Sequence, residues 1–63
     1  MQYHIYATLS DGRMVFNGTL NYVPRINEEV EANGHVFVVQ KVRYVLKEGT
    51  TYANFVELRL KEV

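Results

Sequence analysis

The chain has 63 residues, enough for one small domain, and 48% of them are apolar or aromatic, as in globular proteins. Seven basic residues balance seven acidic ones, which argues against a polyacidic DNA mimic and against nucleic-acid binding driven by bulk charge. The absence of cysteine excludes disulfides and cysteine nucleophiles. No apolar run reaches the ~18 residues of a membrane span and no signal-peptide pattern opens the chain, so we expect one cytoplasmic domain over residues 1–63.

Apolar and polar residues alternate over Gln2–Leu9, which predicts a first strand with its odd-numbered residues facing inward. A turn at Ser10–Gly12 leads to a second predicted strand over Arg13–Tyr22. Its inward row contains Met14, Phe16, Gly18, Leu20 and Tyr22. Val15 is an apolar exception on the outward face of this strand.

Pro24 ends the second strand because proline cannot donate to a ladder. A short strand over Glu29–Ala32 follows, and Asn33-Gly34 predicts a tight hairpin turn with positive φ at both residues. The apolar parity switches within the next strand, His35–Leu46, which predicts a bulge at Gln40-Lys41.

A last turn is predicted at Lys47–Gly49, and the alternation of Val56, Leu58 and Leu60 with charged residues predicts a final strand over about Thr51–Lys61. Five short strands and no helical periodicity favour an all-β small barrel or rolled antiparallel sheet. The alternative is an open five-stranded sheet whose exposed face is covered by a second copy.

A set of mostly structural residues follows one pattern: Pro24, Glu29-Val30, Gly34, Phe37-Val38-Val39, Val42 and Tyr44. In this set the chain resembles short SH3-like β-barrel proteins of bacteria and phages. The resemblance implies an SH3-like barrel and identifies no activity. The chain lacks the cluster of aromatic and acidic residues with which eukaryotic SH3 domains bind proline-rich peptides, so the resemblance does not imply that binding site.

Catalytic residues are not predicted. The single serine, Ser10, precedes Asp11 in a turn and lacks a nucleophile-elbow context. Two histidines without cysteine do not predict a metal site, and the dispersed glycines form no phosphate loop. We therefore expect a non-enzymatic protein without cofactor, metal or small-molecule substrate.

Protein association is the favoured function. Its evidence is a set of apolar residues that violate the alternation, in particular Tyr6, Val15, Val36 and Val38. If the in-register residues fill one core, these four form a second apolar surface that contacts a larger partner or a second copy. Whether Val36 and Val38 lie on the surface or in the core stays open at this point.

Single-stranded nucleic-acid binding is the alternative function, because small barrels bind single strands with aromatic and basic side chains. The candidate residues are Tyr6, Arg13, Lys41 and Arg43. Glu31 and Glu57 are expected to share faces with these cations, which weakens the case.

Overall fold

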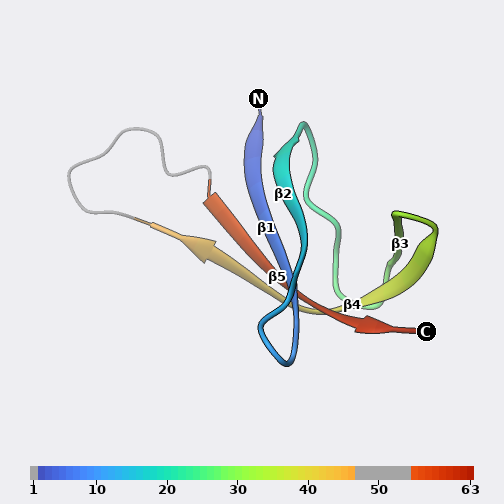
Figure 1. The fold of residues 1–63 in the computed structure, drawn as a ribbon. Helices are drawn as coiled ribbons and strands as arrows, with labels where there is room; N and C mark the ends of the chain where they lie inside the picture. The colour runs from blue at the N-terminus through green and yellow to red at the C-terminus, as the bar shows by residue number, and fades with distance from the viewer. Residues whose placement is uncertain (1, 47–54) are drawn as a thin grey trace.

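A computed structural model describes residues 2–46 and 55–63, and these form a single curved sheet (Figure 1). Five strands build it: β1 (Tyr3–Leu9), β2 (Met14–Leu20), β3 (Glu29–Ala32), β4 (His35–Val45) and β5 (Phe55–Glu62). The sheet curls through 229° into a half-barrel, which confirms the prediction of an all-β, small barrel-like fold. Within the described residues, no helix has the length and apolarity needed to cross a membrane.

The strand order is β2-β1-β5-β4-β3. The β1–β2, β3–β4 and β4–β5 pairs are antiparallel, whereas β1 and β5 pair in parallel. The sheet is therefore mixed: of the two predicted forms, a small barrel or a rolled antiparallel sheet, it has the barrel-like curl and one parallel strand pair. The reason is that the chain crosses from β2 at one edge to β3 at the other, so that β5 enters between β4 and the first strand in the same direction as β1.

The core lies on the inner side of the half-barrel and comes from the three central strands. Its buried members are Ile5, Ala7, Phe37, Val39, Val56, Leu58 and Leu60. All seven belong to the rows predicted to face inward, because the period of two sends alternate side chains of each strand to the same face.

The predicted bulge in β4 is confirmed. Val39 pairs with Leu60 and Lys41 with Arg59, so Gln40 is the extra residue and the parity switches there. Val42 consequently packs against the core. Tyr44 also lies in the core-side row, opposite Val56, but it is 55% exposed because it is beyond the buried centre of the half-barrel. The prediction is wrong for Leu46, which follows the end of β4 and is 75% exposed.

The predicted hairpin turn between β3 and β4 is also confirmed. Asn33 and Gly34 have φ angles of 55° and 82°, the combination that a type I′ turn requires. The predicted turn at residues 47–49 and the predicted start of the last strand at Thr51 lie outside the described residues.

A second bulge, in β2, was not predicted. Ala7 pairs with Phe16 but Thr8 pairs with Met14, so Val15 is the extra residue. Val15 packs against the core and Met14 is 53% exposed. The predicted outward position of Val15 and inward position of Met14 are therefore both wrong, because a bulge reverses the parity that a regular strand would have.

Candidate nucleic-acid interface

The outer face of the sheet is built from rows of residues that lie side by side across β1, β5 and β4. The register of the two strand pairs defines three such rows: His4, Phe55 and Val45; then Tyr6, Glu57 and Arg43; then Thr8, Arg59 and Lys41. An aromatic and apolar row thus lies beside two rows that carry three cations and one acid.

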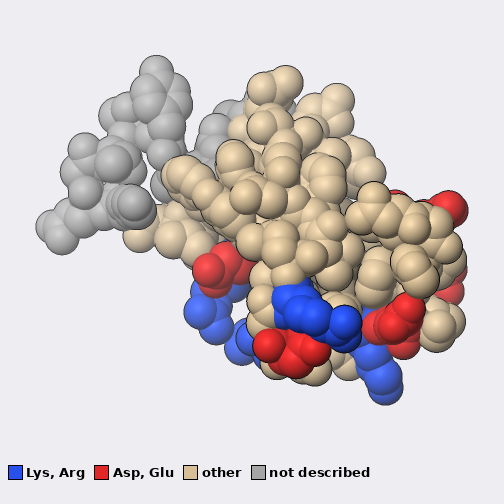
Figure 2. Space-filling view, in the orientation of Figure 1, with Lys and Arg blue, Asp and Glu red and all other residues tan. Residues whose placement is uncertain are grey.

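Charge is segregated although the whole chain is neutral. The segments Gln2–Ser10 and Met14–Pro24 contain no Asp, Glu, Lys or Arg. Figure 2 shows that, on one face, the charged side chains gather in the lower part, whereas the upper part, over the upper ends of β1 and β2, carries none. Three of the cations, Lys41, Arg43 and Arg59, occupy two neighbouring rows of β4 and β5.

Lys41 lies directly opposite Arg59 in the β4–β5 ladder. Like charges in directly opposed positions destabilise a sheet. Across residues 2–46 and 55–63 the ion pairs are Asp11–Arg13, His35–Glu62 and Arg43–Glu57, so neither Lys41 nor Arg59 has an acidic partner there. Two cations held together without neutralisation form a site that favours an anion.

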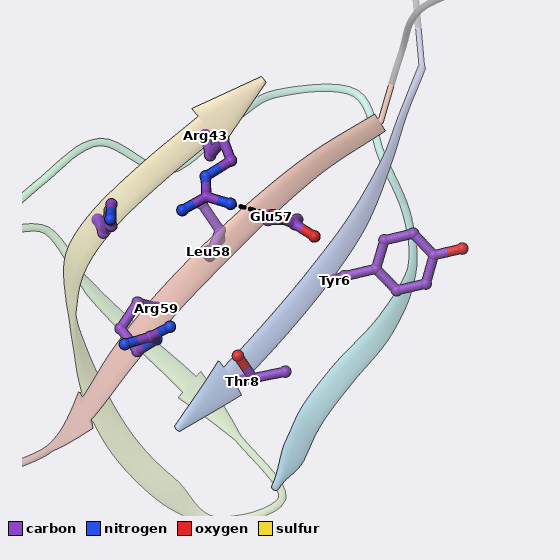
Figure 3. Close-up of a pocket in the computed structure, with 7 residues that line it drawn as sticks. Tyr6, Thr8, Arg43, Glu57, Leu58 and Arg59 are labelled. Carbon is purple, nitrogen blue, oxygen red and sulfur yellow. Dashed lines mark ion pairs between the residues drawn. The ribbon is translucent and has the colours of Figure 1, made fainter. Parts of the chain in front are cut away.

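The neighbouring row supplies a third cation that is partly neutralised. Arg43 Nη1 lies 3.5 Å from Glu57 Oε1 (Figure 3). The two side chains are 59% and 50% exposed, so the pair is screened by water and holds Arg43 only weakly. The guanidinium can therefore exchange Glu57 for a ligand oxygen.

A hollow of about 260 Å³ lies among these residues. It is lined by Tyr6, Thr8, Lys41, Arg43, Glu57, Leu58 and Arg59. In Figure 3, Arg43 lies on β4, and Glu57 and Arg59 lie on β5. Thr8 and Tyr6 project from β1 on the other side, with the Tyr6 ring turned away from the cations. The hollow thus has cations from β4 and β5 on one side and the Thr8 hydroxyl on the other.

Three aromatic rings form a cluster next to the hollow. The Tyr6 and Phe55 rings stack with 5.9 Å between centroids and 12° between planes, and the His4 ring lies 4.6 Å from that of Tyr6. His4 Nε2 donates a hydrogen bond to Asn17 Oδ1 over 2.7 Å, which fixes the imidazole on β2. The cluster is a preformed aromatic surface, in which the His4 ring is tilted by 35° against that of Tyr6, and a planar group can stack on it.

Three of the four residues predicted for nucleic-acid binding, Tyr6, Lys41 and Arg43, line the same hollow. Arg13 does not, because it lies in the β1–β2 turn, where its Nε donates to Asp11 Oδ2 over 2.7 Å. The Asp11 carboxylate also accepts the Arg13 backbone N–H, and chiefly this bond lowers the pKa of Asp11. Sequence reasoning missed Arg59 as a site residue, although the alternation of the last strand already placed it outward.

The residues predicted for protein association are divided between two faces. Tyr6, Val36 and Val38 lie in outward rows, and Val36 is 38% exposed. Val38 is half-buried between Glu29 and Lys61. Lys61 is four positions along β5 from Glu57, which lies in the row of Tyr6, so the rows of Val38 and Tyr6 are about 13 Å apart. Val15 faces inward, so the four residues do not form one surface.

Comparison with known proteins adds no assignment. No protein-family model, curated protein or solved structure matches this chain significantly. In the described part of the chain, no group of three or more His, Cys, Asp or Glu is placed to hold a metal ion. The function must therefore be inferred from the chemistry of the outer face.

Proposed function

We propose that the protein binds single-stranded nucleic acid on the outer face of β1, β5 and β4. The observation that carries this proposal is the opposition of Lys41 and Arg59, neither of which has an acidic partner among residues 2–46 and 55–63. A sheet that tolerates this repulsion gains from an anion placed between the two side chains, and a phosphate group satisfies both cations at once.

The aromatic cluster favours a nucleic acid over a simple anion. Proteins that bind single strands without sequence preference combine basic side chains along the backbone with aromatic rings on which bases stack. Tyr6 lies two strands away from Arg43, about 10 Å. One extended strand can therefore stack a base on Tyr6 and place a phosphate group at the cations. Thr8 adds a hydroxyl donor beside Arg59.

A binding titration tests this proposal. Fluorescence anisotropy of labelled 15-nucleotide mixed-sequence DNA and RNA at 20 mM salt is expected to report binding that weakens as salt is added. Arg59→Ala and Lys41→Ala should each reduce the slope of log affinity against log salt by about 0.7, the value for one phosphate contact with a single strand. Tyr6→Leu should weaken binding by ~1–3 kcal/mol through lost stacking.

Lys61→Ala is the matched control. Lys61 belongs to the same face of β5 but lies opposite Val38 and outside the hollow, so its removal lowers the net charge equally without touching the site. Equal losses in Lys61→Ala and Lys41→Ala would indicate a general charge effect. No binding at 20 mM salt, where electrostatic attraction is strongest, would reject the proposal.

Protein association remains a second candidate, at the β2 edge of the sheet. The observation that favours it is the β2 edge, along which no other described strand lies, next to exposed Phe16 and Tyr22. An SH3-like relationship, a bacterial or phage origin and a cytoplasmic location also remain proposals. They rest on the residue pattern from Pro24 to Tyr44 and on the composition.

A further inference from the structure

β2 is one of the two outer strands of the sheet. Six of its seven residues pair with β1 on one side, Val15 being the bulge residue, and within the described residues no strand lies along its other side. The unpaired N–H and C=O groups of such an edge can pair with a strand of another chain.

Neither β2 nor residues 21–24 after it carry the charges that usually protect an edge. Residues 14–24 contain no Asp, Glu, Lys or Arg, and Figure 2 shows this part of the face uncharged. Exposed apolar side chains occur there instead: Met14 is 53% exposed, Phe16 36% and Tyr22 59%. Natural edge strands are normally blunted by charge, by proline or by brevity. A bulge also blunts an edge, and β2 has one at Val15.

An apolar groove of about 140 Å³ opens beside this edge. Phe16, Leu20 and Tyr22 line it from β2 and the segment after it, and Val30 and Ala32 line it from β3. Because the half-barrel does not close, these side chains border its open interior. The exposed parts of Phe16 and Tyr22 alone amount to roughly 200 Å².

We propose that β2 pairs antiparallel with β2 of a second copy of this chain. Identical strands that pair antiparallel are related by a twofold axis, so the contact is self-complementary and closes at two copies. A pairing centred on Gly18 brings Phe16 of each copy opposite Leu20 of the other on the inner face. β2 contains no charged residue, so no like charges meet across this strand pair.

The other edge of the sheet argues for this partner. β3 has four residues, and exposed Glu29 and Glu31 alternate along it, so two β3 edges repel each other. Pairing of β2 with β3 of a second copy would leave one edge of each kind free and would continue into a filament. Pairing of β2 with β2 covers the uncharged edge of both copies and stops at a dimer.

The area predicts a weak dimer. A short strand pair with two aromatic side chains per copy buries less than the ~800 Å² per partner of a standard interface. The twofold axis is perpendicular to the sheet, so the outer faces of both copies lie on the same side of a continuous ten-strand sheet. The hollows lined by Lys41 and Arg59 would then be available together.

Sedimentation equilibrium between 10 µM and 1 mM protein tests the inference. Thr19→Lys adds a charge at an exposed position of β2 and is expected to raise the dimer dissociation constant at least tenfold. Val36→Lys adds the same charge at an exposed position of β4 and should leave it unchanged. Circular dichroism checks that both variants keep their β spectrum.

A measurement on the wild-type chain covers the case in which Thr19→Lys does not fold. Amide hydrogen exchange at residues 14–20 should slow as protein concentration rises from 10 µM to 1 mM, while exchange in β4 stays constant. A monomer at 1 mM overturns the inference. So does growth beyond two copies, or loss of the dimer in Val36→Lys with retention in Thr19→Lys, which would place the contact on the outer face of β4.

Discussion

The opposition of Lys41 and Arg59 predicts that one substitution raises stability and lowers binding. Lys41→Glu turns a repulsive cross-strand pair into an attractive one. For charges ~6 Å apart in water, each of these interactions amounts to about 0.7 kcal/mol before screening. With the Debye length of ~8 Å at physiological salt, the total change is about 0.6 kcal/mol in favour of the variant. For a domain of this size that corresponds to a rise in Tm of about 3–5 °C.

Thermal unfolding followed by circular dichroism at 20 mM, 150 mM and 1 M NaCl measures this difference. It should grow to about 1 kcal/mol at the lowest salt and shrink to a few tenths at the highest, because screening removes both repulsion and attraction. The same variant should bind single-stranded DNA about tenfold or more weakly at 20 mM salt.

Lys61→Glu is the control, because it changes the net charge equally but lies opposite Val38. It should produce neither the stabilisation nor the full loss of binding. If Lys41→Glu is no more stable than the wild type at 20 mM salt, the two cations do not oppose each other and the argument for an anion site fails.

Three further predictions concern the turns and β2. Gly34→Val should destabilise the protein by roughly 1 kcal/mol or more in urea unfolding because φ is 82° there, and a negligible effect would contradict the type I′ turn. A methyl group at Gly18 would lie 2.8 Å from Phe16 Cζ, so Gly18→Ala should destabilise by about 1 kcal/mol, and by much less in a Phe16→Leu background; equal effects in both backgrounds would show that the ring does not cover Gly18. The pKa of Asp11 is lowered in the folded state from its ordinary value of 3.8. The ionised carboxylate therefore contributes to stability above the unfolded pKa, and this contribution is lost as pH falls through the lower pKa of the folded state. Asp11→Asn should flatten that part of the stability profile between pH 2 and 5, and an unchanged profile would contradict the bond from Arg13.

Local patterns predicted the parts of the fold that depend on neighbouring residues. The β3 strand and its turn at Asn33-Gly34 follow from alternation and from the positive φ that this dipeptide accepts. The bulge at Gln40 follows from a change in apolar parity within one strand. The bulge at Val15 gave no such signal, because Met14, Val15 and Phe16 are all apolar and either parity buries an apolar side chain.

The candidate site depends on long-range register, which the sequence does not determine by parity alone. Burial of Leu58 and Leu60 sends Glu57, Arg59 and Lys61 to the outer face, but parity allows Lys41 to lie opposite any of these three. A slip of two residues would pair Lys41 with Glu57 and remove its repulsion with Arg59.

The observed register keeps that repulsion, and packing explains why. It places Leu60, which is 2% exposed, across from Val39, which is fully buried, and it keeps β5 aligned with Ile5 and Ala7 of β1. Burial of one leucine side chain contributes ~1.5–3 kcal/mol, whereas an exposed like-charge pair costs less than 1 kcal/mol. The core therefore selects the register, and the two cations are left facing each other on the outside, where a ligand phosphate can neutralise them.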